Sequence, residues 1–500
     1  MKHVKQLLSA LLVLAVVLSL LPAGVLKASA AEALAALDIG YPTFKNTELL
    51  DEVYDLSKLG VSYSEKDIMM AIYKQDLANG GDSFYMDRIL AREGVCNGNA
   101  GSNGNADGNT FLTRGRALYM YTSSPSVIGF GGNTAYHQPL GRGDLVRVLF
   151  SNADGSLTTK EDTSKRVNAP SNWSSTYSVG SNLTLDVVKF IHQENVAVTT
   201  MTLTNKSAED QAITVAADSI FATEPGKVTV NGAEQTELTG TCSSPAGLTT
   251  IYARMTGDGF EAASSDDYCW LSRDVTVPAG GSVELKVVIA FTTEEIPEST
   301  EQYLRFAGLG NLEAVRAQKA EYNLYWAENL PYIDVPKKAV QKAIDYRWWL
   351  ERFNSLDANI PGYDYQYPVT IEGVLGYNNA IILTQPMHLQ DTKWLRSPYL
   401  AYGQLLSAGN SSQSSAFLDN PGNRNNWNNH YGQYLAEAGY EAFNVIGGGA
   451  EVAENFAYYF GHDATGQLEH YGNHIEGRDL IAYRNNYMTG NDADTISMHA

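Results

Sequence analysis

Residues 183–204, LTLDVVKFIHQENVAVTTMTLT, set the fold of the first large part of this chain. Apolar and β-branched side chains alternate with polar ones along Leu183–Ile191 and Val196–Thr204. Successive side chains of a strand point to opposite faces of its sheet, so this period predicts strands with one buried face. The same pattern recurs at Arg116–Thr122, Leu145–Phe150, Ala212–Ser219, Leu248–Met255, Val275–Val277 and Val283–Phe291.

Turn-forming residues separate these segments, at Asn152–Gly155, Asn231–Gly232 and Ala279–Gly281. Many short strands with turns between them are typical of two packed antiparallel sheets. The sequence therefore predicts a β-sandwich of about twelve or more strands over residues 110–295.

The period becomes helical after Glu294. One long amphipathic helix is predicted over Glu301–Trp326, and a new helix starts at Pro336. A helix over Asn428–Ile446 ends at three glycines, and a second helix over Ala450–Phe460 follows at once. So short a loop forces the two helices into an antiparallel hairpin, and such hairpins repeated in a ring form an α/α-barrel.

The N-terminus has the pattern of a secretion signal. Lys2 and Lys5 precede an apolar run over Leu7–Leu21, and Ala28–Ala30 has the small-x-small form of a cleavage site. No later apolar run approaches the roughly 18–20 residues that span a bilayer, so a secreted, extracellular protein is predicted. The expected organisation is multidomain α+β: signal peptide 1–30, mixed segment 31–109, β-sandwich 110–295, helical linker 296–335, and helical domain 336–500.

The net charge limits which partners the chain can bind, and the cysteine count limits its disulfides. The net charge of −21 and the pI near 4.8 exclude nucleic acid, which this chain would repel, but not a neutral polymer. Cys242 and Cys269 either pair or stay buried thiols, with Cys96 left free. No cofactor is expected; the Asn- and Gly-rich run Gly94–Thr110 is a surface loop or, alternatively, a Ca²⁺ site.

The C-terminal part is dense in carboxylates, Asn, His and aromatic rings. Amides and carboxylates bind sugar hydroxyls, and flat rings stack on the C–H faces of a sugar, so this composition predicts a carbohydrate substrate. The richest stretches are Asp345–Trp349, Tyr367–Asn379, Trp427–Tyr431 and Tyr487–Asp494.

The order of secretion signal, sandwich, linker helix and helical hairpins with such loops resembles the six-hairpin (α/α)6-barrel glycoside hydrolases. Over residues 110–500 the chain is similar to the superfamily of trehalases and processing α-glucosidases, and within it to the β-L-arabinobiosidase type. The resemblance implies a supersandwich followed by an (α/α)6 toroid. It also implies a general acid at the Asp of a Gly-x-Asp motif, here Gly490–Asp492.

The same resemblance raises an expectation about length. Six helical hairpins need about 300 residues, whereas about 165 follow Pro336. The barrel is therefore expected to be incomplete, with the family's second catalytic carboxylate missing from this chain and the chain itself an inactive fragment.

Glycosidic cleavage needs one protonated and one ionised carboxyl group. Asp492 is the predicted proton donor, and Asp494 would raise its pKa by like-charge repulsion. The alternative is a pair of loop or helix-capping aspartates. Glu372 is a predicted catalytic or sugar-binding carboxylate. The predicted substrate-binding residues are Arg347, Trp349, Tyr377, Asn378, Asn379, Trp427, Asn428, Asn429 and His430.

Structural roles compete for several of these residues. At least one of Trp348 and Trp349 is expected in the core, and Asn428 would equally cap a helix. His470 and His474 lack a third ligand, so no metal site is predicted. The motifs of acyl, phosphoryl and hydride transfer are absent from the sequence. A glycoside hydrolase is the leading hypothesis; the alternatives are a polysaccharide lyase on the same scaffold and a noncatalytic sugar-binding protein.

Overall fold

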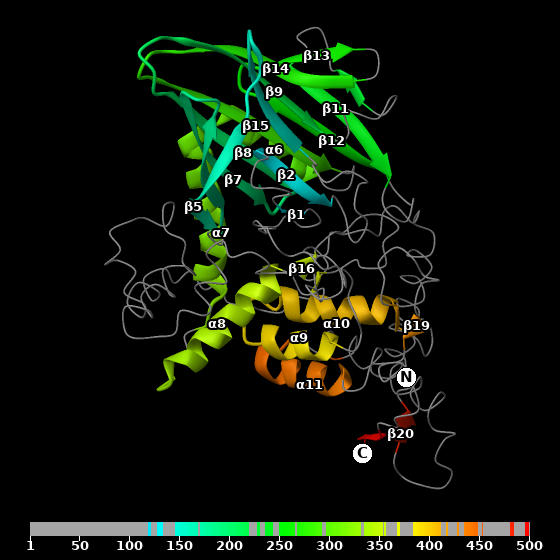
Figure 1. The fold of residues 1–500 in the computed structure, drawn as a ribbon. Coiled ribbons are helices and arrows are strands. Elements are labelled where there is room, and N and C mark those ends of the chain that lie inside the picture. Colours follow the sequence, from blue (N-terminus) through cyan, green and yellow to red (C-terminus); the bar gives the residue numbers. More distant parts are fainter. Residues whose placement is uncertain are drawn as a thin grey trace, which may run out of the picture.

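The computed structural model describes residues 119–121, 128–133, 146–168, 171–219, 228–230, 236–243, 250–265, 268–292, 297–331, 335–353, 355–356, 368–370, 384–411, 417–418, 428–429, 435–448, 453, 481–484 and 496–499. A two-layered β-sandwich is followed by a group of helices (Figure 1). The prediction of a sandwich before a helical region is confirmed. The closed toroid stays a prediction.

The described strands of the sandwich form two antiparallel sheets. A seven-stranded sheet has the order β1-β2-β3-β9-β14-β13, with β4 paired to β3, and an eight-stranded sheet has the order β10-β11-β12-β15-β8-β7-β6-β5. The strands are β1 (Tyr119–Tyr121), β2 (Ile128–Asn133), β3 (Val146–Asn152), β4 (Gly155–Ser156), β5 (Thr159–Asn168), β6 (Trp173–Val179), β7 (Leu183–His192), β8 (Val196–Asn205), β9 (Gln211–Ser219), β10 (Val228–Val230), β11 (Glu237–Ser243), β12 (Thr250–Gly257), β13 (Glu261–Ser265), β14 (Tyr268–Val277) and β15 (Ser282–Thr292).

Eight of these strands correspond to predicted segments, whereas β2, β4, β5, β6, β10, β11 and β13 were not predicted. β5 and β6 are rich in Ser, Thr and charged residues, so they lack the apolar alternation that marks the others. Cys269, on β14, is a free cysteine in the structure, so the pairing with Cys242 considered above is not formed. Burial raises the pKa of the Cys269 thiol.

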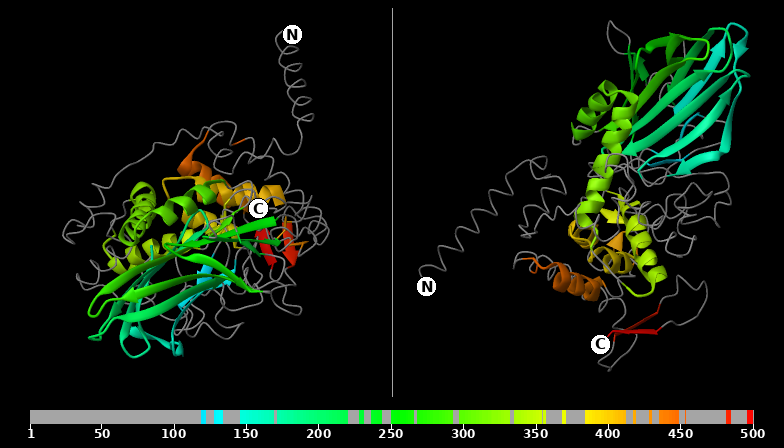
Figure 2. Two further views of the ribbon diagram at one scale, coloured as in Figure 1. Left: turned by 90° about the horizontal axis from the view of Figure 1, so that it is seen from above. Right: turned by 90° about the vertical axis from the view of Figure 1, so that its left-hand side faces the viewer.

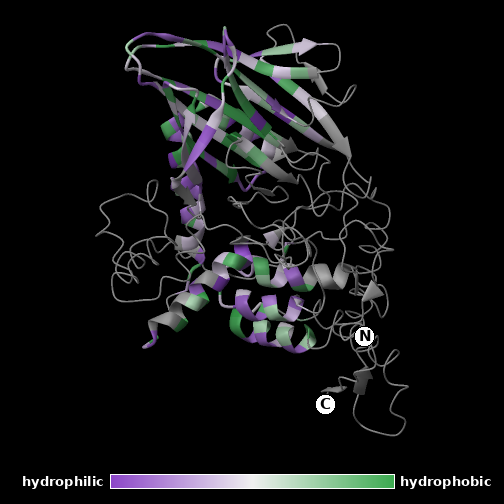
Figure 3. Cartoon of the chain, in the orientation of Figure 1, coloured by the Kyte–Doolittle hydropathy of each residue, from purple (hydrophilic) through white to green (hydrophobic). Residues whose placement is uncertain are grey.

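The core lies between the two sheets. Leu185 and Val187 on β7 are buried, as are Val148 on β3 and Val215 on β9. Hydrophobic and hydrophilic residues alternate along the elements rather than forming blocks (Figure 3), as a half-buried sheet requires. Burying one such aliphatic side chain contributes about 1.5–3 kcal/mol.

One lysine is enclosed in this core. The Lys189 ammonium is fully buried, donates to the Gly129 carbonyl oxygen at 2.5 Å and lies 4.2 Å from the centre of the Trp173 ring. The carbonyl and the ring replace part of the water that a charged group loses on burial. Because Gly129 lies on the opposite sheet, this contact joins the two layers.

Helices α6 (Pro297–Gly308) and α7 (Asn311–Asn329) cover the outer face of the eight-stranded sheet (Figure 2). Phe306 on α6 and Ala314 on α7 pack with Phe190, Val198 and Val288 of the sheet. The apolar end of this face therefore becomes a second core, between sheet and helices.

The prediction of a single helix over Glu301–Trp326 is wrong, because the chain breaks at Leu309–Gly310. The sheet holds this break in place: the Lys286 ammonium donates to the Leu309 carbonyl, and the Asn311 amide donates to the carbonyls of Met201 and Leu285 at 3.1 and 3.2 Å. Gly310, in extended conformation, precedes the second helix. Glycine favours such a position over a helix interior, where it costs about 1 kcal/mol.

A charged network joins β7 to both helices. Glu321 on α7 lies 2.8 Å from His192 Nε2 and 2.5 Å from a guanidinium nitrogen of Arg305. The Glu194 backbone N–H donates to His192 Nδ1, so Nε2 carries the proton donated to Glu321. Burial alone would raise the pKa of Glu321, but the hydrogen bonds from His192 and Arg305 outweigh it and lower the pKa to about 2.

Helix α8 (Lys338–Phe353) begins just after Pro336, as predicted, and is joined to α7 through Arg352. The Arg352 guanidinium lies 4.2, 3.8 and 5.3 Å from the ring centres of Tyr322, Tyr325 and Trp326. It also donates to the Tyr322 carbonyl at 3.0 Å. This clamp connects the sandwich's covering helices to the helical region.

The helical region contains α9 (Gln385–Thr392), α10 (Tyr399–Ser411) and α11 (Leu435–Ile446), which lie beside one another below the sandwich (Figure 1). Three small ribbons accompany them. They are β16 (Ser355–Leu356) with β17 (Val369–Thr370), β18 (Phe417–Leu418) with β19 (Asn428–Asn429), and β20 (Ile481–Arg484) with β21 (Ile496–His499). Within the described residues, no helix combines the length and apolar character that a bilayer crossing requires.

The glycine stop of α11 is confirmed, but its predicted start at Asn428 is wrong. The helix ends at Ile446, and Gly447 and Gly448 follow with φ of 81° and 135°, which glycine adopts without strain. The helix starts at Leu435, because Asn428 and Asn429 instead pair with β18. The predicted second helix of the hairpin, Ala450–Phe460, lies outside the described residues apart from position 453.

Candidate functional site

Buried and half-buried polar side chains gather along α9, which packs on both α8 and α10, and at β17, which α10 contacts. Most helices pack through apolar contacts, and buried polar groups in such a position need partners. We call this set the α8–α10 polar cluster. Its members are Glu351, Thr370, Gln385, His388 and Gln404.

Glu351 and His388 form the ionisable part of the cluster. The distance from His388 Nδ1 to Glu351 Oε1 is 2.9 Å, and the two side chains are 17% and 7% exposed. The second carboxylate oxygen, Glu351 Oε2, is buried with no hydrogen-bond partner. A buried carboxylate oxygen without a donor is costly, so it marks a place where a water or a ligand hydroxyl would bind favourably.

Gln385 and Gln404 bind the same residue of β17 from two helices. The Gln385 amide donates to the Thr370 carbonyl oxygen, and the Gln404 amide donates to the Thr370 hydroxyl, both at 3.2 Å. Both side chains are at least 98% buried, and the amide oxygens of both lack a hydrogen-bond partner. Together with Glu351 Oε2, three buried acceptors are left for donors that the described protein groups do not supply.

The close contact of α10 with β17 depends on Gly403. A Cβ atom at this position would lie 2.4 Å from Pro368 Cγ and 2.7 Å from the Pro368 carbonyl oxygen. Only a residue without a side chain lets the helix approach so closely. The glycine next to Gln404 therefore allows that amide to reach Thr370.

Helix α10 also brings two predicted sugar-binding stretches to one place. At one side it contacts β17, and Thr370 stands two positions before Glu372 in the sequence. It also contacts β18, which pairs with β19, the strand formed by Asn428 and Asn429. Within the described residues, Val369–Thr370 and the pair β18–β19, which includes Asn428 and Asn429, thus lie next to a single helix.

Two predicted binding residues lie on α8. Trp349 is 5% exposed and belongs to the packed interior, as does Trp348, whose indole N–H donates to the Asp391 carbonyl at 3.0 Å. Arg347 is on the exposed side and makes a bidentate ion pair with the Asp391 carboxylate, with Nε 2.9 Å from Oδ2. Their contact with a sugar stays a prediction.

The remaining predicted site residues lie outside the described part of the chain: Asp492, Asp494, Glu372, Tyr377, Asn378, Asn379, Trp427 and His430. The loop Gly94–Thr110, considered for Ca²⁺, also lies outside it. Among the described residues there is no group of three or more His, Cys, Asp or Glu side chains that could hold a metal ion.

Of the α8–α10 polar cluster, only Thr370 lies in a stretch singled out from the sequence, Tyr367–Asn379, and Glu351, Gln385, His388 and Gln404 were missed. Glu351 stands in the same helix as the predicted Arg347 and Trp349, and Gln385 and His388 are three positions apart, hence on one face of α9. That spacing could have indicated that Gln385 and His388 act on the same side of a helix. Without the packing of α9 against α8, however, nothing indicated that this face is buried.

No protein-family model matches the chain. Among solved structures, it is similar to a protein from the human microbiome described as a kojibiose phosphorylase, with 10% identity and a TM-score of 0.49 over 70% of this chain and 56% of that one. It is also similar to an inverting mannosidase of family GH92 from Bacteroides thetaiotaomicron, with 14% identity and a TM-score of 0.40 over 71% and 55%.

A second family GH92 protein of that organism, an α-mannosidase, matches with 12% identity and a TM-score of 0.34 over 71% of this chain and 54% of that chain. This chain thus spans little more than half the length of each of these proteins. At TM-scores below 0.5 these similarities establish no family for it.

Proposed function

We propose that this chain is a secreted carbohydrate-active protein of the glycoside hydrolase type, which cleaves O-glycosidic bonds by carboxyl chemistry in its helical region. The observation that carries the proposal is the set of three buried, unpartnered acceptors on Glu351, Gln385 and Gln404. The two glutamines bind Thr370, two positions before Glu372, and Glu351 pairs with His388 on the same helix as Gln385. Sugar hydroxyls are the donors that such acceptors suit.

In this proposal Asp492 protonates the leaving oxygen, and Glu372 activates water or attacks the anomeric carbon. Asp494 keeps Asp492 protonated by like-charge repulsion. The cluster beneath Thr370 positions the Glu372 loop and binds hydroxyls of the substrate. The aromatic and amide residues at Tyr377–Asn379 and Trp427–His430 form the walls of the sugar site.

The test measures reducing-sugar release from a panel of neutral oligosaccharides, together with the ultraviolet absorption of any unsaturated product. In a complete enzyme that contains these residues, Asp492→Asn and Glu372→Gln should each lower the turnover by a factor on the order of 10² or more. Asp154→Asn, an isosteric change in an exposed turn of the sandwich, is the matched control and should keep full activity.

Each other outcome selects a different function. An unsaturated product would indicate a lyase, and binding without any product would indicate a noncatalytic sugar-binding protein. If Asp494→Asn rather than Asp492→Asn abolished turnover, the proton donor would be Asp494. For secretion, the mature protein should begin at Ala31, which N-terminal sequencing of the culture supernatant checks.

A further inference from the structure

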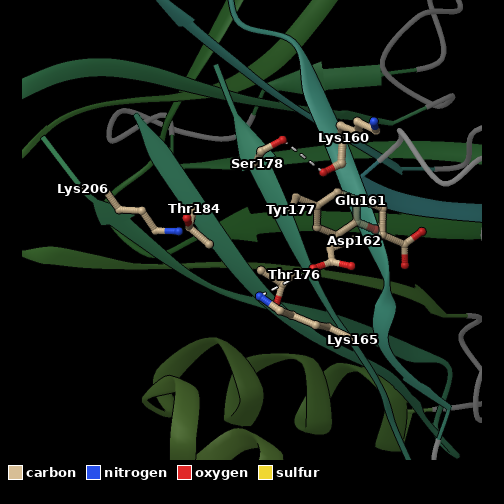
Figure 4. Close-up of a pocket in the computed structure, with 9 residues that line it drawn as sticks. All are labelled: Lys160, Glu161, Asp162, Lys165, Thr176, Tyr177, Ser178, Thr184 and Lys206. Carbon is tan, nitrogen blue, oxygen red and sulfur yellow. Dashed lines mark hydrogen bonds and ion pairs between the residues drawn. The ribbon is translucent and has the colours of Figure 1, made fainter. Parts of the chain in front are cut away.

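A pocket opens on the outer face of the eight-stranded sheet, at the edge formed by β5, β6 and β7 (Figure 4). Its volume is about 360 Å³, within the range of small-ligand sites. It lies on the sandwich, at the part of this face away from the α6 and α7 contact. None of the residues proposed for catalysis lines it.

A β-bulge builds one wall of the pocket. Asp162 pairs with Thr176, but the next recorded pair is Val167 with Ser174, so β5 advances five positions while β6 advances two. The three extra residues bend the edge strand, as bulges do, and re-aim their side chains. The Asp162 carboxylate holds this bend by accepting from the backbone N–H and the hydroxyl of Ser164, at 3.2 and 2.6 Å.

Three lysines surround the opening: Lys160 on β5, Lys165 in the bulge and Lys206 just after β8. All three are exposed. Two carboxylates also line the pocket, and a third, Asp186, accepts from the Thr176 hydroxyl at 2.6 Å beside it. Asp162 binds Ser164 and lies 3.6 Å from Lys165, and Glu161 is 93% buried and accepts from the Ser175 hydroxyl at 2.6 Å.

The floor between the lysines is hydroxylic. Thr176, Ser178 and Thr184 are on the outward face of β6 and β7, because their neighbours Tyr177 and Leu185 are buried in the core. The three lysines form a rim around these hydroxyls and outnumber the two carboxylates of the lining by one, and of the three only Lys165 forms an ion pair with a described carboxylate. Lysine ammonium groups act as compact charges for oxyanions, and hydroxyls both donate and accept.

We propose that this pocket binds an acidic sugar, through the carboxylate of a uronate or through a sulfate ester, as a docking point separate from the reaction site. The lysines bind the anionic group and the Thr and Ser hydroxyls bind its sugar neighbours. The preference for an anion follows from the pocket alone; the sugar part rests on the proposed function. Binding at so exposed a site is weak and falls with salt.

Edge-strand lysines also have a purely protective role, since they block pairing with another chain. That role requires no ligand and does not depend on the lysines meeting at one pocket. A binding experiment therefore separates the two roles.

The experiment is saturation-transfer difference NMR on the full chain at low salt, with trigalacturonate, a sulfated disaccharide and neutral maltotriose as probes. The variant Lys160→Gln/Lys165→Gln/Lys206→Gln removes the rim. The control Arg316→Gln/Lys319→Gln/Lys337→Gln removes the same charge from α7 and the start of α8. Thr184→Val tests the floor without changing charge, and circular dichroism checks that each variant folds.

We expect an acidic probe to bind the native chain and the control variant, while the rim variant loses about tenfold or more in affinity. Signal from trigalacturonate alone identifies a uronate ligand, and signal from the sulfated probe alone identifies a sulfate ester. Signal from both acidic probes indicates that the pocket recognises negative charge of either kind. The proposal is overturned if neither acidic probe binds, or if rim and control variants lose affinity equally. Loss of hydrolysis in Asp492→Asn, with binding at this pocket retained, would separate the two sites.

Discussion

Replacing Arg352 by alanine should weaken the helical region while leaving the sandwich intact. The guanidinium packs on three aromatic rings at 3.8–5.3 Å and donates to the Tyr322 carbonyl at 3.0 Å. A partly desolvated cation–π contact contributes about 1–2 kcal/mol, and a hydrogen bond from a charged donor about 1.5–3 kcal/mol. These contributions overlap, so we expect a loss of about 2–4 kcal/mol. Arg352→Lys should lose about half as much, because an ammonium keeps the charge but not the planar stacking.

Differential scanning calorimetry of the full chain tests this, since a multidomain protein unfolds in separable steps. The transition of the helical region should move down by roughly 5–10 °C, and that of the sandwich should stay. Arg347→Ala is the matched control on the same helix, because its ion pair with Asp391 is 58% exposed on the arginine side and such pairs contribute at most about 1 kcal/mol. Equal effects of the two substitutions, or an unchanged Arg352→Ala profile, would refute the clamp.

Three further predictions follow from single contacts. Gly403→Ala should cost about 1–3 kcal/mol, because its methyl group collides with Pro368; chemical denaturation measures this, and wild-type stability would show that α10 is not held against β17. Gln404→Leu should change stability by no more than about 1 kcal/mol, because it removes a buried unpaired acceptor but also the hydrogen bond to the Thr370 hydroxyl, and in a complete enzyme it should lower kcat/KM by about tenfold; unchanged kinetics would remove the amide from the substrate site. Glu321 has a pKa of 4.5 when unfolded and about 2 when folded, so its stabilisation is complete above pH 4.5 and is lost as pH falls through about 2. With a half-exposed side chain, the stabilisation from Glu321 amounts to ~1–2 kcal/mol. Urea unfolding of the native chain and of Glu321→Gln from pH 7 to pH 2 measures it: the difference in stability between the two should shrink as the pH falls. A difference that stayed constant would contradict the network.

The bounds of several strands could be predicted from the sequence to within two residues. The segments predicted at Leu183–Ile191 and Val196–Thr204 correspond to β7 and β8. One face of each strand packs in the sandwich core, so apolar and polar residues alternate along the sequence and the strand can be recognised from it. β5, the edge strand, and its neighbour β6 were missed because their outward positions are polar and Ser and Thr also fill several inward ones. The outward polar residues that made these strands hard to recognise in the sequence, such as Lys160, Thr176 and Ser178, also line the pocket.

The helices show the same limit. Gly447 ended α11 where the sequence predicted, because a glycine at positive φ acts through its own backbone. The break at Leu309–Gly310 was not predicted, because it depends on Lys286 and Asn311 binding across to the sheet. Likewise, Asn428 and Asn429 left the expected helix for a ribbon whose partner strand is ten positions earlier in the chain.

For the candidate site, the sequence by itself determined which residue types are available: carboxylates, amides and rings concentrated after Asp345. It did not reveal that the two glutamines become buried against Thr370, or that His388 pairs with the buried Glu351. Only the tertiary structure decided this, because it depends on α8, α9 and α10 packing on one another. Periodicity reports how neighbouring residues alternate along one element; which faces then meet, and which polar atoms are left without donors, is set by contacts between segments far apart in the chain.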